Sequence, residues 1–137
     1  MQRETFYGQI VGQVIRGRRE LQGINLLTMA ESVTLASASG WSRVETGDTT
    51  MNLSQLRKAA KKLGVEPWAM IHQADLIAAQ LEASGVTVHD DKPKNLRKWL
   101  LGGAGILALV AGAAAAASST RTSTGSKTSK DEDEEES

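Results

Sequence analysis

The segment GWSRVETGD, residues 40–48, decides how the N-terminal part of the chain folds. Trp41 and Val44 are three residues apart, a spacing that places both side chains on the same face of a helix. The Gly-Asp dipeptide that ends the segment is typical of a turn. We therefore predict a helix over residues 37–44 that buries Trp41 and Val44 and leaves its opposite face in solvent.

Two asparagines mark the starts of helices on either side of this segment. Asn25 precedes residues 26–33, and its side-chain oxygen is suited to accept from the unpaired amides of a first helical turn. Asn52 is followed three residues later by Gln55, a variant of the capping box. We predict short helices over residues 26–33 and 53–64.

The first and last helices complete the bundle. Apolar residues recur with helical spacing over residues 7–21. Pro67 suits the first position of a helix that continues to Gly85, because its missing amide proton costs nothing there. We predict that the five helices share one core and make residues 1–85 an all-α domain.

The 137 residues have a formal net charge of zero, but the charge is unevenly distributed. Residues 1–98 carry a net charge of +3 and residues 118–137 a net charge of −3. The chain has no cysteine, and its two histidines, His72 and His89, stand far apart, so we predict neither a metal site nor a cofactor. No nucleophile–base pair is evident, and the only glycine-rich GGAG stretch lies inside an apolar run. We therefore do not expect an enzyme.

A longer pattern of glycine, apolar and charged residues extends over residues 8–66. Its positions are Gly12, Ile15, Arg16, Arg19, Gly23, Ile24, Asn25, Met29, Ala30, Trp41, Ser42, Arg43, Val44, Glu45, Gly47, Leu53, Leu56, Ala60, Leu63, Gly64 and Val65. This order and spacing resembles the Cro/C1-type (XRE, lambda-repressor-like) helix-turn-helix family. The resemblance implies a lambda-repressor-like bundle that binds double-stranded DNA. It also implies that Arg19 and Glu45 form a structural pair, which joins the first helix to the end of the third.

The resemblance directs attention to the second, third and fourth helices as the DNA-binding surface. Arg is one of the bidentate side chains that discriminate bases most strongly, and Arg43 is the one of this kind on the exposed face of the third helix. Amides at helix N-termini and nearby cations commonly meet phosphates, although a row of cations is also typical of a solvated helix face. The candidate DNA-binding residues are Asn25, Ser37, Ser39, Gly40, Ser42, Arg43, Arg57, Lys58, Lys61 and Lys62.

Two features depart from the family pattern. Leu26 stands where the family usually has a Gln that binds the phosphate backbone. The stretch from Ala30 to Glu45 is one residue longer than the common spacing, which predicts an insertion in the turn VTLAS. Gly40 also weakens the third helix by roughly 1 kcal/mol relative to Ala. A helix-turn-helix that recognises a protein therefore stays open as the alternative.

An apolar segment, WLLGGAGILALVAGAAAAA, occupies residues 99–117. It contains no charged residue, Asn, Gln or Pro. As a helix it would span roughly 28 Å, close to the bilayer hydrocarbon thickness of about 30 Å. We predict a membrane-spanning helix, anchored through Trp99, Leu100, Leu101, Ile106, Leu107, Leu109 and Val110. Residues 86–98 are predicted to be a polar, basic juxtamembrane linker, and residues 118–137 a disordered Ser/Thr-rich acidic tail.

The flanks of this segment suggest an orientation. Four basic side chains lie in residues 92–98, and the N-terminus lacks the apolar core of a signal peptide. We expect a single-pass protein of the cytoplasmic (inner) membrane with its N-terminal domain in the cytoplasm. Ala108 and Gly112 form a small-xxx-small pair, which suggests a homodimer through the span.

The layout leaves two functions open. The first is a membrane-anchored DNA-binding protein, which acts as a transcriptional regulator or as a DNA–membrane tether. The second follows from a resemblance in layout to RodZ-type cell-shape proteins, in which such a domain binds a bacterial actin filament. It would make this chain a membrane-anchored scaffold with a cytoplasmic protein partner.

Overall fold

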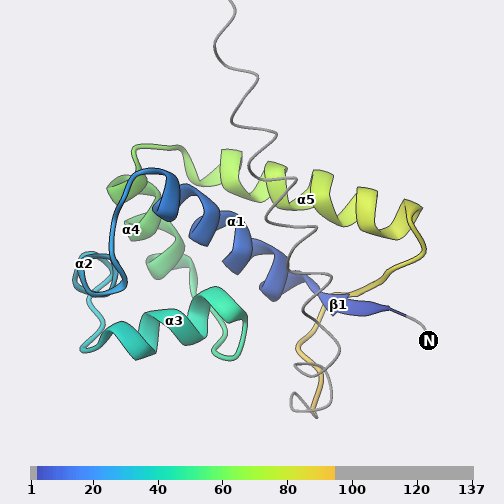
Figure 1. The fold of residues 1–137 in the computed structure, drawn as a ribbon, viewed down its shortest axis with the longest axis horizontal. Coiled ribbons are helices and arrows are strands. Elements are labelled where there is room, and N and C mark those ends of the chain that lie inside the picture. The colour runs from blue at the N-terminus through green and yellow to red at the C-terminus, as the bar shows by residue number, and fades with distance from the viewer. Residues whose placement is uncertain (1–2, 95–137) are drawn as a thin grey trace, which may run out of the picture.

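The computed structural model describes residues 3–94 of the chain. Within this range the fold is mostly helical, which confirms the all-α expectation at that level. The elements are β1 (Glu4–Phe6), α1 (Tyr7–Leu21), α2 (Leu26–Ser32), α3 (Ala38–Thr46), α4 (Leu53–Leu63), α5 (Pro67–Ala83) and β2 (Thr87–His89). Figure 1 shows α1 between α5 and α3, while α2 and α4 lie together at one end of the bundle.

Polar side chains start the helices at the positions that the sequence predicts. The Asn25 side chain accepts from the Thr28 amide at 2.8 Å and caps α2. Asn52 and Gln55 form a reciprocal capping box at the start of α4, with bonds of 2.8 and 3.1 Å. Each cap satisfies amides that the first helical turn leaves without a partner.

The third helix is displaced from its predicted range of 37–44. Ser37 lies outside α3 as its N-cap and accepts from the Gly40 amide at 3.1 Å. The helix continues to Thr46 and ends at Gly47, whose φ of 82° suits glycine. A Cβ on Gly47 would also come within 2.7 Å of the Phe6 ring. Gly47 therefore ends α3 and makes room for Phe6 beneath it.

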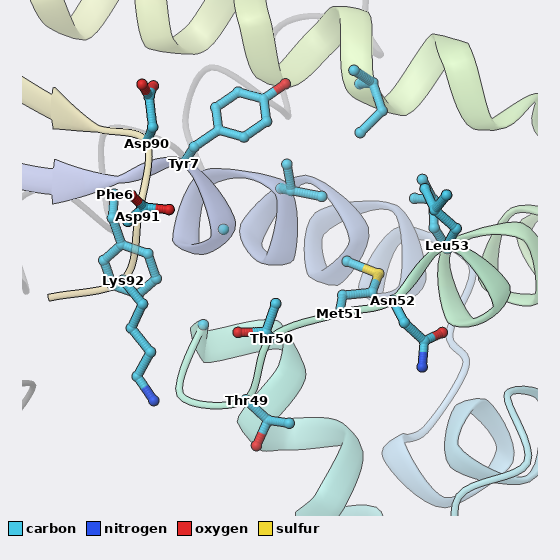
Figure 2. A pocket seen from close by; sticks show the side chains of 15 residues that line it. Phe6, Tyr7, Thr49, Thr50, Met51, Asn52, Leu53, Asp90, Asp91 and Lys92 are labelled. Atoms are coloured by element: carbon cyan, nitrogen blue, oxygen red, sulfur yellow. The ribbon is translucent and has the colours of Figure 1, made fainter. Parts of the chain in front are cut away.

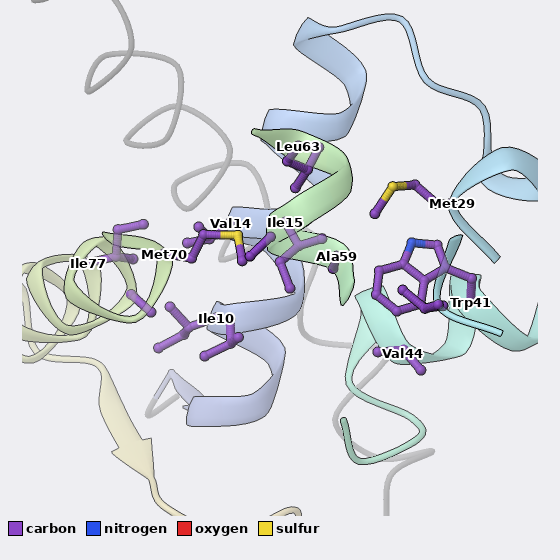
Figure 3. Close-up of a cluster of buried hydrophobic side chains, with 14 of the residues drawn as sticks. Ile10, Val14, Ile15, Met29, Trp41, Val44, Ala59, Leu63, Met70 and Ile77 are labelled. Carbon is purple, nitrogen blue, oxygen red and sulfur yellow. The ribbon is translucent and has the colours of Figure 1, made fainter. Parts of the chain in front are cut away.

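The hydrophobic core forms on both sides of α1. Ile10, Val14 and Ile15 are fully buried there. They are part of a cluster that runs from Met70 and Ile77 on α5 to Trp41 on α3 (Figure 3). Because one helix supplies side chains to both halves of the core, the position of α3 is fixed relative to α5.

The two strands were not predicted from the sequence. β1 and β2 pair in parallel, with Glu4 opposite Thr87 and Phe6 opposite His89. Val86 is buried, so the segment predicted to be a linker from residue 86 begins inside the folded domain. Three-residue strands are too short to show an alternating pattern, and their pairing partners lie far apart in the sequence.

One side-chain hydrogen bond joins the start of α1 to α5. Tyr7 Oη donates to Asp75 Oδ1 at 2.6 Å. Burial raises the pKa of the Tyr7 phenol well above its usual range, and the hydrogen bond to Asp75 and the charge of that carboxylate raise it further.

The predicted membrane anchor lies outside the described residues. The span 99–117, with Trp99, Leu100, Leu101, Ile106, Leu107, Leu109 and Val110, and the tail 118–137 follow the last described residue. In residues 3–94 no helix combines the length and the apolar character that crossing a bilayer requires.

Candidate nucleic-acid interface

The turn between α2 and α3 closes α2 with a Schellman motif. The Leu35 amide donates to Ala30 O at 2.8 Å, and the Thr34 amide donates to Glu31 O at 3.1 Å. Thr34 has a φ of 64°, a left-handed conformation that a β-branched residue rarely adopts. Strained residues of this kind persist only where surrounding contacts hold them.

A side chain from α4 supports this turn. Lys58 Nζ donates to Thr34 Oγ1 at 2.9 Å, and Lys58 itself is half-buried. The bond holds the threonine side chain and sets a cation beside the turn between the two helices. Among the candidate DNA contacts on α4, Lys58 is therefore the one whose side chain bonds the turn between α2 and α3.

A buried polar network holds the inner side of α3. Arg19 Nε and Nη2 donate to the two oxygens of Glu45 at 2.6 and 3.1 Å. Trp41 Nε1 donates to Glu45 Oε1 at 2.8 Å, and Arg19 Nη1 donates to Ile24 O at 2.8 Å. Arg19 is 7% exposed and Glu45 2% exposed. The structure thus brings together the two residues that the sequence analysis paired, in the bidentate geometry that guanidinium and carboxylate favour.

The backbones of α1 and α3 meet at Gly12. A Cβ at this position would lie 2.2 Å from Glu45 O and 2.9 Å from Val44 O. Gln13 Nε2 donates to the same Glu45 carbonyl at 3.1 Å. Gly12 therefore permits the close helix crossing that lets Arg19 reach Glu45.

The outer side of α3 carries few functional groups. Ser39 and Arg43 are exposed and one helical turn apart, and the half-buried Thr46 continues the same row. The Arg43 side chain makes no hydrogen bond or ion pair within residues 3–94, so its guanidinium is available. The remaining candidates on this helix, Ser37, Gly40 and Ser42, lie at its start or its edges.

The other candidate cations lie on α4. Arg57, Lys61 and Lys62 are exposed, and their side chains make no ion pair in the described part of the chain. Arg57 and Lys61 line a groove of about 690 Å³ that reaches from Leu53 to Pro67. With Lys58, which bonds the turn between α2 and α3, they place four basic side chains on one helix.

The start of α2 is less suited to phosphate. The acceptor oxygen of Asn25 is occupied by the Thr28 amide. Leu26 is half-buried, and Leu27 is 52% exposed. Two apolar side chains thus follow the cap of α2.

Two residues near this surface were missed by the sequence analysis. Thr34 supports the turn, and Thr46 lies on the outer row of α3 with its hydroxyl donating to Arg43 O at 3.2 Å. The expected one-residue insertion directed attention to this turn, but nothing in the sequence indicated that a threonine would take the left-handed position.

The described residues contain no group of three or more His, Cys, Asp or Glu side chains that could hold a metal ion. In comparisons with protein-family models, curated proteins and solved structures, nothing matches the chain.

Proposed function

We propose that the protein is a Cro/C1-type helix-turn-helix DNA-binding protein, anchored to the membrane, that acts as a transcriptional regulator or a DNA–membrane tether. The observation that carries the proposal is the orientation of α3. Its inner side is locked by Arg19 and Glu45, and its outer side presents an unpaired Arg43. In helix-turn-helix proteins the second helix of the motif enters the major groove and contacts base edges.

The proposed contacts divide into two kinds. Arg43, with Ser39 beside it, would meet base edges, because a guanidinium can bond a guanine at two atoms. Arg57, Lys61 and Lys62 would meet phosphates and set the register of the domain on the duplex. Lys58 is partly engaged with Thr34, so its contribution would be the smaller one on α4.

The DNA-binding part of the proposal is tested with the full-length protein in a non-ionic detergent and short fluorescent duplexes of random and genomic sequence. Each neutralised phosphate adds about −0.9 to the slope of log affinity against log salt. Changing Arg57, Lys61 and Lys62 to Ala should make the slope shallower by about 3. Arg3→Gln, before β1 at the end of the bundle opposite α4 (Figure 1), is the matched control and should leave the slope nearly unchanged. A full-length protein that binds no duplex at low salt contradicts the proposal.

The membrane part rests on the sequence of residues 99–117 and on the basic residues before it. Because the chain has no cysteine, single cysteines can report the orientation. Ser137→Cys should react with a membrane-impermeant maleimide in intact cells, and Glu82→Cys on α5 only after lysis. The reverse pattern contradicts the orientation, and recovery of the protein in the soluble fraction contradicts the anchor. Crosslinking in membranes tests the homodimer, which a purely monomeric protein would exclude.

A membrane-anchored scaffold is the second candidate, and one observation favours it. Leu27, in the first turn of α2, is 52% exposed, and Leu21, the last residue of α1, is 63% exposed. An apolar surface at this position suits a protein partner better than a phosphate backbone. The same DNA titration separates the two candidates, because a scaffold needs no affinity for a duplex.

A further inference from the structure

A cleft of about 300 Å³ lies on the side of the bundle where the two ends of the described chain meet. Figure 2 shows Phe6, Asp91 and Lys92 at one end of it, and Met51 and Leu53 at the other. Its walls thus come from the start of α1, the loop between α3 and α4, the start of α4, and the segment after β2. Its volume is at the lower end of the range for small-molecule sites.

The interior of the cleft is apolar. Phe6 and Val11 are 2% and 7% exposed and form its deepest part. Met51, Leu56 and Ile71 are half-buried around it and pack against the hydrophobic core. These side chains leave an apolar surface that a hydrophobic group of matching size would remove from water.

The mouth of the cleft is negatively charged. Asp90 and Asp91 are exposed, and neither makes a hydrogen bond or ion pair through its side chain within residues 3–94. The nearby Lys92 does not offset them, because its Nζ lies 3.6 Å from Asp48 Oδ1 and also donates to the Asp48 carbonyl. Two uncompensated carboxylates therefore border an apolar cavity.

We propose that this cleft is a binding site for a small amphipathic cation, with an apolar group held between Val11, Met51 and Ile71 and an ammonium group attracted by the negative charge of Asp90 and Asp91, whose side chains leave the segment after β2 in different directions (Figure 2). The apolar walls supply most of the contact area, and the carboxylates select the charge of the ligand. None of the candidate DNA contacts lines the cleft, although it shares Leu53 and Leu56 with the groove that Arg57 and Lys61 line. The site is independent of the proposed function, and its test needs no DNA.

The four methionines provide a local readout in the full-length protein. Met51 lines the cleft, whereas Met29 and Met70 are fully buried in the core. With methyl-¹³C methionine labelling in detergent micelles, 2-phenylethylamine should shift the Met51 methyl signal saturably at neutral pH. The signals of Met29 and Met70 should stay in place. A Met51 signal that does not move, or that moves without saturation, overturns the site.

The charge of the ligand is tested with 2-phenylethanol, the neutral probe of nearly equal shape. Replacing Asp90 and Asp91 by Asn should weaken binding of the amine about threefold to tenfold, as expected for losing two exposed charge contacts. The affinity for the alcohol should not change. The matched control replaces Glu31 and Glu82 by Gln, which removes the same charge from exposed positions outside the cleft. Equal affinity for amine and alcohol in the unmodified protein overturns the proposed class of ligand.

A blocking variant completes the test. Thr50 is exposed, lies in the loop before α4 and borders the cleft. Thr50→Trp should fill the space without touching the core, and should abolish the saturable Met51 shift with both probes. If both probes still bind this variant with unchanged affinity, they bind elsewhere and the proposal fails.

Discussion

The two sides of α3 differ in how fully their polar groups are used. On the inner side, Glu45 accepts three hydrogen bonds from Arg19 and Trp41, and Gln13 bonds its carbonyl oxygen. On the outer side, Arg43 has no side-chain partner in residues 3–94. The inner groups fix the position of α3 in the bundle, and the outer groups remain available to a binding partner. Changes to the inner side should therefore act on stability, and changes to the outer side on binding.

The largest effect is expected from Glu45→Ala. It leaves the buried Arg19 without its carboxylate, and breaking a buried pair in this way costs about 3–5 kcal/mol. Urea denaturation of the full-length protein measures the loss. Arg19→Met combined with Glu45→Leu removes both charges and should cost less than the single change. If the double variant is the less stable of the two, the contacts of the pair matter more than its charge balance.

The second largest effect is expected from Gly12→Ala, which should lower the free energy of unfolding by about 3 kcal/mol. The added methyl group meets the backbone of Glu45 and Val44 at 2.2 to 2.9 Å, so α1 and α3 must separate. Gly40→Ala on α3 is the matched control, because its Cβ meets only the Ser37 hydroxyl at 3.3 Å. It should leave the free energy of unfolding within about 1 kcal/mol of the original. Equal losses at the two glycines would contradict the tight crossing.

On the outer side, Arg43→Ala should change stability by less than about 0.5 kcal/mol. It should reduce discrimination between duplex sequences by about 1–3 kcal/mol if Arg43 reads a base pair. Affinities for a preferred and a random duplex at one salt concentration give this difference. A uniform weakening for both duplexes would instead make Arg43 a phosphate contact.

Thr34→Gly tests the turn that joins α2 to α3. Glycine adopts a φ of 64° without the cost that other residues pay, so the change should stabilise the domain by about 1 kcal/mol. Loss of the Lys58 bond reduces this gain. Thr34→Ala removes the same hydroxyl without relieving the backbone and should destabilise. Thermal unfolding of the two variants separates backbone strain from the side-chain contact.

A small effect is also expected for Tyr7→Phe, which removes a hydrogen bond that is much more exposed than the α3 network. Its cost should be about 1 kcal/mol below pH 10. Because the folded pKa of Tyr7 is raised above the usual value of about 10, this phenol favours the folded state fully below pH 10 and ceases to do so as the pH rises above it. The stability of the original protein should therefore fall faster above pH 10 than that of the variant. Parallel curves would mean that Tyr7 ionises equally in both states.

The helices could be predicted because their signals are local. Asn25, Asn52 and Pro67 lie within a few residues of the groups that they cap or start, and α1 has the predicted bounds. The strands and the cleft could not be predicted, because they form only where residues more than eighty positions apart in the sequence come together. The left-handed Thr34 is a third kind of case. There the spacing directed attention to the turn, but a contact from α4 decides how the turn is held.

The parallel pairing of β1 with β2 has a mechanical consequence. A pull on the chain beyond residue 94, against a domain held at α3, first reaches the contact between Lys92 and Asp48 and then the His89 end of β2. Load applied there opens the strand bonds one after another, and the force required stays small. We therefore expect the two strands to separate at a lower force than the helical bundle needs to unfold.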